Sequence, residues 1–113
     1  MGFLMRTILI AVLGVALCTT AARADYRYLA IRNAAQVTIM SKICARVHLD
    51  DLRFMAMLKA GDINVERDRD DLSSEMAIQV AQWKGIDPGE VCVAALRFYG
   101  PNGALVPNLL SEN

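Results

Sequence analysis

The sequence predicts an all-α protein: a small four-helix domain closed by one disulfide, after an N-terminal signal peptide. Three observations lead to this prediction. The first residues have the pattern of an export leader, the rest of the chain holds two cysteines, and its apolar residues recur at helical spacing between glycines and prolines. We therefore divide the chain into residues 1–24, the signal peptide, and residues 25–113, a single helical domain.

The leader has the three parts of a secretory signal. Arg6 supplies a positive charge, an apolar run over residues 8–18 follows, and small residues precede the expected cleavage between Ala24 and Asp25. The apolar run is well short of the roughly 20 residues that a membrane-spanning helix needs. We therefore expect a periplasmic or secreted protein with no stable membrane insertion after cleavage. The alternative is an uncleaved membrane anchor.

Cleavage also changes the charge of the domain. Arg6 and Arg23 are two of the 12 basic residues, so their loss leaves a small excess of the 12 acidic residues. A mildly acidic domain without a basic run gives no electrostatic reason to expect nucleic acid as a partner. The choice of start, Met1 or Met5, does not alter this result.

Three cysteines become two when the leader is removed, because Cys18 leaves with it. In an exported protein the remaining pair, Cys44 and Cys92, predicts a disulfide. Closing so long a loop restricts the unfolded chain by roughly 4 kcal/mol. The alternative is a redox-active or metal-binding thiol pair, which the lack of a C-x-x-C spacing and of a neighbouring histidine disfavours.

The first two helices follow from apolar spacing and from their ends. A helix over about residues 28–47 places four apolar residues on one face: Val37, Met40, Cys44 and Val47. A shorter helix has its body at residues 52–58. Asp50 or His48 is its expected cap, and Gly61 is the glycine that follows its end.

Two more helices complete the domain. The third runs from about residue 70 to 84, with an apolar stripe of Leu72, Met76, Val80 and Trp83. The fourth starts at Asp87-Pro88, a capping residue followed by a proline in the first helical position, and ends at Tyr99. We expect the fourth helix to be the most buried, residues 104–113 to fold back over the core, and no stretch to form a sheet.

The methionines raise the possibility of a copper site. Met55 and Met57 form an M-x-M pair, with His48 nearby in sequence and Trp83 elsewhere. Thioether and imidazole groups suit Cu(I), and the set loosely resembles that of periplasmic copper carriers. Those carriers present M-x-M on a strand, whereas residues i and i+2 of a helix point in different directions. Core packing is therefore the favoured interpretation, and His48, Met55 and Met57 remain metal candidates only.

An acidic stretch invites comparison with a calcium-binding loop. Five residues fall at ligand positions of an EF-hand: Asn64, Glu66, Asp68, Asp70 and Glu75. Arg69 occupies the position that needs a glycine, and Arg67 adds a second positive charge inside the loop. A solvated loop before a helix is the simpler interpretation, so we expect neither a metal nor another cofactor.

Catalysis has little support in the sequence. His48 is the only histidine, and it stands without a recognisable nucleophile motif or a phosphate-binding glycine loop. A lone histidine before a short helix is more often a cap or a surface residue. We therefore expect a protein that is not an enzyme.

The layout of the domain is similar to that of the small acid-stress chaperones of the HdeA type. The resemblance rests on the number and the separation of Cys44 and Cys92, and does not extend to the residues around them. It implies an exported helical protein that loosens in acid. The leading hypothesis is a non-catalytic accessory protein that binds another envelope protein, with the acid-stress chaperone and the copper-binding protein as alternatives. The sequence leaves the oligomeric state open.

Overall fold

The computed structural model describes residues 26–113. The predicted signal peptide, Cys18 and the cleavage site between Ala24 and Asp25 lie outside the described residues. The described chain is mostly helical, which confirms the predicted helical class. Its elements are a helix over residues 26–43, β1 (Val47–Leu49), α2 (Asp51–Ala60), α3 (Arg69–Trp83), α4 (Pro88–Tyr99) and β2 (Leu110–Glu112).

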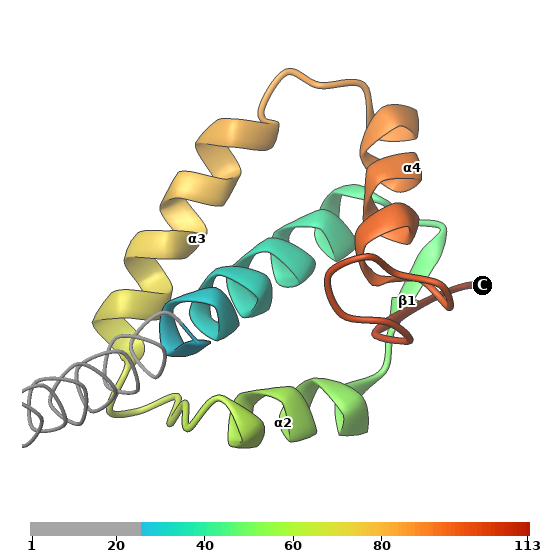
Figure 1. Ribbon diagram of the computed structural model, residues 1–113. Helices are drawn as coiled ribbons and strands as arrows, with labels where there is room; N and C mark the ends of the chain where they lie inside the picture. The colour runs from blue at the N-terminus through green and yellow to red at the C-terminus, as the bar shows by residue number, and fades with distance from the viewer. Residues whose placement is uncertain (1–25) are drawn as a thin grey trace, which may run out of the picture.

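Helix 26–43 is the centre of the molecule. Figure 1 shows it between α2 and α3, with α4 at its C-terminal end. It also carries more buried residues than α4, so the expectation that the fourth helix is the most buried was wrong. The physical reason is its position, because a helix with neighbours along its whole length buries side chains on several faces.

The ends of α2, α3 and α4 lie within about two residues of the predicted ones, a usual margin for helix ends. Asp50 caps α2 by accepting a hydrogen bond from the backbone N–H of Arg53 at 3.0 Å. Asp87 caps α4 in the same way, from Gly89 at 3.0 Å. Gly85 has a φ of 81°, a conformation that suits glycine and lets the chain turn after α3.

A small sheet was not predicted. β1 and β2 pair antiparallel, with Val47 opposite Glu112 and Leu49 opposite Leu110. The first helix accordingly ends at residue 43, before the predicted position 47. Each strand has three residues, too few for an alternating pattern to show, and the partners come from distant parts of the chain.

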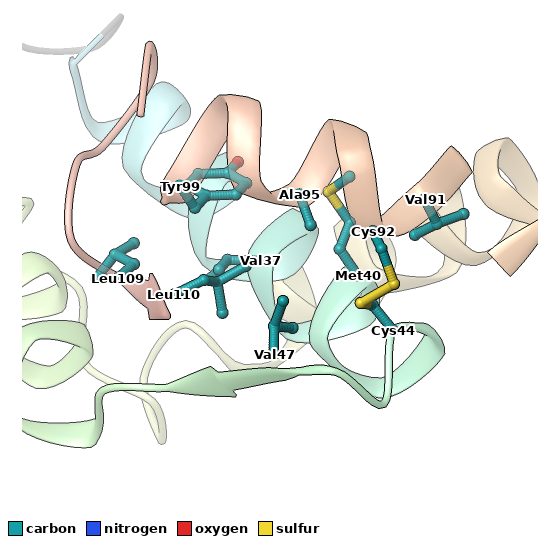
Figure 2. Packing of buried hydrophobic residues seen from close by; sticks show 10 residues of the cluster. All are labelled: Val37, Met40, Cys44, Val47, Val91, Cys92, Ala95, Tyr99, Leu109 and Leu110. Atoms are coloured by element: carbon teal, nitrogen blue, oxygen red, sulfur yellow. A yellow bond between two sulfur atoms is a disulfide. The ribbon is translucent and has the colours of Figure 1, made fainter. Parts of the chain in front are cut away.

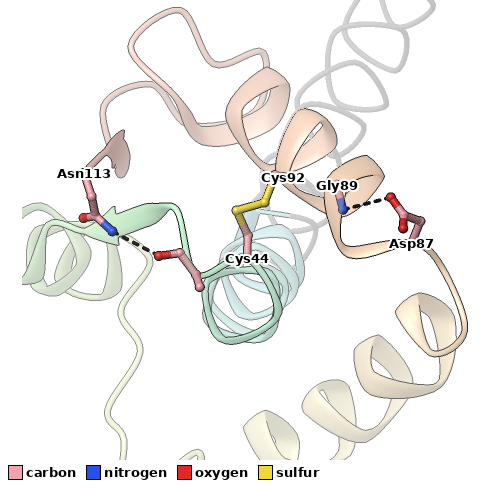
Figure 3. Close-up of a disulfide and its surroundings, with 6 residues drawn as sticks. Cys44, Asp87, Gly89, Cys92 and Asn113 are labelled. Carbon is pink, nitrogen blue, oxygen red and sulfur yellow. Dashed lines mark hydrogen bonds between the residues drawn. A yellow bond between two sulfur atoms is a disulfide. The ribbon is translucent and has the colours of Figure 1, made fainter.

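The larger core surrounds the disulfide between Cys44 and Cys92, which the structure forms as predicted. We call it the disulfide cluster (Figure 2); its buried members are Val37, Met40, Cys44, Val47, Val91, Cys92, Ala95, Tyr99, Leu109 and Leu110. The predicted apolar face of the first helix is buried here, and residues 109 and 110 bring the C-terminal segment over the core, as expected. Figure 3 shows the Asn113 side chain donating to the carbonyl of Ala45, 3.1 Å away and beside the disulfide.

A second, smaller core lies toward the other end of helix 26–43. We call it the alanine cluster; it comprises Ala30, Ile31, Ala34, Leu58 and Ile63. Gly61 allows the end of α2 to approach closely, because a Cβ at this position would lie 2.5 Å from the Cβ of Ala30. Small residues thus set the distance between the two helices.

The predicted apolar stripe of α3 is confirmed in part. Leu72, Met76 and Trp83 are half-buried, and Val80 is exposed. The most deeply buried residues of the helix are Glu75 and Gln79. Their side chains form a polar chain along the helix: Gln79 donates to Glu75 at 3.5 Å and accepts from the indole N–H of Trp83 at 3.1 Å. Because polar groups can be buried when they bond to one another, apolar spacing alone did not predict that Glu75 and Gln79 belong to the buried face.

Candidate functional site

Two helices supply matching faces to an open groove with a volume of about 580 Å³. Helix 26–43 contributes Tyr26, Leu29, Ala30 and Asn33, and α2 contributes Arg53, Ala56, Met57 and Ala60, followed by its C-cap Gly61. The four residues from each helix follow the i, i+3, i+4, i+7 spacing of a single helical face. The groove is therefore a direct product of how these two helices pack.

The C-terminal segment forms the third wall of the groove with Leu105, Val106, Pro107 and Leu109. This wall is held by backbone hydrogen bonds. The N–H of Leu105 donates to the carbonyl of Phe98 at 3.0 Å, and that of Asp50 donates to the carbonyl of Leu109 at 2.9 Å. The segment thus joins the end of α4 to the start of α2.

Three lining residues bear polar groups: Tyr26, Asn33 and Arg53. The Tyr99 hydroxyl lies 3.0 Å from the side-chain amide of Asn33 and donates its proton to the nearer amide oxygen of Gln36, at 2.6 Å. Arg53 lies at the rim, where its Nε is 3.5 Å from a carboxylate oxygen of Asp50. The other lining residues are apolar or glycine, so most of the groove lining is apolar.

The acidic stretch considered for calcium forms a clamp, which we call the Asp68 clamp. The buried carboxylate of Asp68 accepts hydrogen bonds from Arg27, from Arg67 at 3.0 Å and from the backbone N–H of Asn64 at 2.9 Å. The Arg67 hydrogen bond and the Asn64 N–H lower the pKa of Asp68 despite its burial. The clamp ties the start of helix 26–43 to the segment between α2 and α3.

The remaining calcium candidates are engaged or dispersed. The side-chain oxygen of Asn64 accepts from the backbone N–H groups of Glu66 and Arg67, each at 3.0 Å. Asp70 is exposed, whereas Glu75 is buried beside Gln79. In the described part of the chain, no group of three or more histidine, cysteine, aspartate or glutamate side chains is placed to hold a metal ion.

The methionine pair lies in α2, as predicted, and its two side chains diverge. Met55 is 65% exposed, while Met57 packs against both core clusters and lines the groove. His48 is an exposed residue of β1, opposite Ser111, and Asp50 is the cap of α2 instead. The expected divergence of an M-x-M pair on a helix is confirmed.

Sequence reasoning missed the groove as a site. The signal was present in the spacing of Tyr26, Leu29, Ala30 and Asn33, but the predicted helix began at about residue 28, so Tyr26 was not placed on the same face. The third wall could not be inferred, because it depends on where residues 105–109 return to the fold. The apolar character of this segment did predict its return to the core.

Comparison of the chain with protein-family models, with curated protein sequences and with solved structures found no match. Among the described residues, no helix combines the length and apolar character needed to cross a bilayer. The protein is thus defined by its own structure: a small helical protein with one disulfide and an open apolar groove.

Proposed function

We propose that the protein works outside the cytoplasm as a non-catalytic binding protein, and that its groove takes an apolar segment of another envelope protein. The groove is the observation that carries this proposal. Its volume of about 580 Å³ is in the range of ligand sites, which are concave and lined mainly by apolar side chains. The disulfide supports the location, because disulfides persist in oxidising compartments.

The composition of the groove favours a polypeptide as the occupant. Small residues line it where the two helices meet, at Ala30, Ala56, Ala60 and Gly61. Larger apolar residues rise beside them, among them Leu29 and Leu105, which are partly exposed. An open groove of this kind fits successive side chains of a peptide segment better than it encloses a small molecule.

Site-specific photo-crosslinking in cells tests the proposal. A photoreactive amino acid at position 105 lies in the groove, and the same residue at position 93 lies outside it on α4. The two native side chains are similarly exposed, Leu105 at 50% and Val93 at 57%, which makes them a matched pair. We expect a discrete protein adduct from position 105 only. Equal adducts from both positions, or none from position 105, would refute binding in the groove.

The Asp68 clamp favours a second candidate, an acid-activated chaperone. The clamp holds together two segments that contribute residues to the alanine cluster, and protonation of its carboxylate removes the charge that both arginines face. Loss of the clamp in acid would expose apolar surface to unfolded client proteins.

Two measurements at about pH 3 test the chaperone candidate. The near-UV circular dichroism of Trp83 and Tyr99 reports on tertiary packing, and light scattering reports on the aggregation of an acid-denatured client. A chaperone loses part of the first signal and suppresses the second. A protein that keeps its near-UV signal and leaves client aggregation unchanged is not an acid-activated chaperone.

A further inference from the structure

We propose that the groove selects a partner segment in which an acidic side chain stands beside apolar ones, and that Arg53 receives the carboxylate. This inference rests on the proposed function, because it names the chemistry of the partner that the same groove takes. It follows from two features of the groove: the free terminal donors of Arg53 and the lack of a carboxylate among the described lining residues.

Arg53 is poised at the rim with its terminal nitrogens available. Its contact with Asp50 involves Nε, at 3.5 Å, and among the described residues no other partner meets the side chain. The side chain is 59% exposed, so its fork of donors reaches solvent at the groove edge. A planar guanidinium with two unused nitrogens binds a carboxylate in a bidentate way.

Asn33 adds a neutral amide to the groove, 3.0 Å from the Tyr99 hydroxyl. The described lining contains no acidic residue, and its one charged side chain is Arg53. Charge complementarity therefore favours an acceptor-bearing, anionic segment.

The exposed position of Arg53 also makes pairing with an acidic side chain favourable. A charge at the rim stays partly hydrated, so its pairing with Arg53 does not carry the desolvation cost of a buried ion pair. The apolar neighbours of the acidic residue then contact the apolar lining, which includes Ala56 and Leu105. Apolar contacts supply affinity, and the rim pair supplies selectivity.

Selection from a random peptide library displayed on phage tests this inference on the folded wild-type domain. We expect enriched peptides to carry aspartate or glutamate next to large apolar residues. For one selected peptide, replacing its acidic residue with glutamine should weaken binding about tenfold. The Arg53→Glu variant should lose the same peptide and should instead select peptides with lysine or arginine.

Control variants separate the two levels of the proposal. Leu105→Lys alters the groove without touching Arg53, and Arg69→Gln removes an exposed arginine that does not line the groove. Peptides that lose affinity for Leu105→Lys but bind Arg53→Glu and wild type equally would overturn the role of Arg53 and leave the proposed function standing. Peptides that bind Leu105→Lys as well as wild type would overturn both. Unchanged binding to Arg69→Gln is expected, and a loss equal to that of Arg53→Glu would overturn the specific role of Arg53.

Discussion

The two ends of helix 26–43 are stabilised in different ways. At its C-terminal end the disulfide cluster combines a covalent link, the paired strands β1 and β2, and the fully buried Tyr99. At its other end the alanine cluster depends on the close contact of Ala30 with Gly61 and on the charged groups of the Asp68 clamp. One helix thus joins a cross-linked core to a smaller core without a cross-link.

The difference matters because the groove borders both cores. Ala30 of the alanine cluster and Leu109 of the disulfide cluster line it, and Met57 packs against both cores. Regions with fewer buried apolar contacts open more readily than the rest of a fold. The side of the groove that borders the alanine cluster can therefore adjust to a partner while the disulfide cluster holds the other side in place.

Removal of the disulfide should have the largest effect. The Cys44→Ala, Cys92→Ala double variant loses the restriction that the cross-link places on the unfolded chain, across a sequence separation of 48. We expect the free energy of unfolding to fall by roughly 4 kcal/mol, measured by urea denaturation. A change below about 1 kcal/mol would show that the cross-link is not what distinguishes the two cores.

A methyl group at position 61 should disturb the alanine cluster next most strongly. In Gly61→Ala the new Cβ lies 2.5 Å from that of Ala30 before any relaxation, so the end of α2 must move. We expect a loss of about 1–3 kcal/mol in urea denaturation. The backbone at Gly61 has an ordinary φ of −85°, so strain from glycine's special conformations does not contribute.

The matched control for this substitution is Ala30→Gly, alone and combined with Gly61→Ala. Ala30→Gly costs up to about 1 kcal/mol through helix propensity. The pair should lose less stability than the two single variants added together, because one change makes room for the other. Simple additivity would contradict the close contact as the cause.

The contrast between the cores also explains which parts of the fold the sequence predicted. Local signals were sufficient for the helices: Asp50, Asp87 and Gly85 act within a few residues of their own positions. The count of two cysteines after the predicted leader was sufficient to predict the disulfide. The groove and the sheet were missed because both depend on residues 105–113 returning to elements early in the chain, and no local pattern encodes that distance.

The inner face of α3 shows a different limit. Apolar spacing selected Val80, which is exposed. Glu75 and Gln79 are buried instead, because hydrogen bonds join Trp83 to Gln79 and Gln79 to Glu75. Hydrogen bonds of this kind satisfy polar side chains at positions i and i+4. A prediction from apolar spacing assigns such residues to the exposed face. Asp68 shows the same limit, because its neighbours in sequence are exposed as predicted for a solvated loop, while Asp68 itself is buried and pairs with Arg27 and Arg67.

Loss of the Tyr99 hydroxyl should have a moderate effect within the disulfide cluster. The hydroxyl lies 2.6 Å from the amide oxygen of Gln36, which is itself buried, and Tyr99→Phe leaves that oxygen without this donor. We expect a loss of about 1–2 kcal/mol at neutral pH by urea denaturation. An unchanged stability would mean that water or another group satisfies Gln36.

Alkaline pH provides a second measure of the same site. Burial raises the pKa of Tyr99 above its ordinary value of 10.0. The unfolded chain then ionises first, so the stability that Tyr99 contributes is complete below pH 10.0 and declines as the pH rises above it. The stability difference between wild type and Tyr99→Phe should therefore narrow above that pH. A constant difference would argue against burial of a neutral hydroxyl.

Acid should act on the other core, through Asp68. Its pKa is lowered, first by the Arg67 hydrogen bond, so the unfolded chain takes up the proton at a higher pH than the folded one. The stability it contributes is complete above the ordinary value of 3.8 and is lost as the pH falls through the lowered pKa. Arg27, Arg67 and the exposed Asp62 are the charged groups around it, and both arginines stay protonated throughout.

The Asp68→Asn variant isolates that contribution. We expect it to lower the free energy of unfolding at neutral pH less than the variants described above. Wild type should be more stable than the variant above pH 3.8, and the gap should close as the pH falls further. Asp70→Asn is the matched control, because Asp70 is an exposed acid in the first turn of α3. Urea denaturation at a series of pH values measures the gap. If Asp68→Asn and Asp70→Asn follow the same curve, the clamp does not set the acid response, and acid would have to act on the disulfide cluster as much as on the alanine cluster.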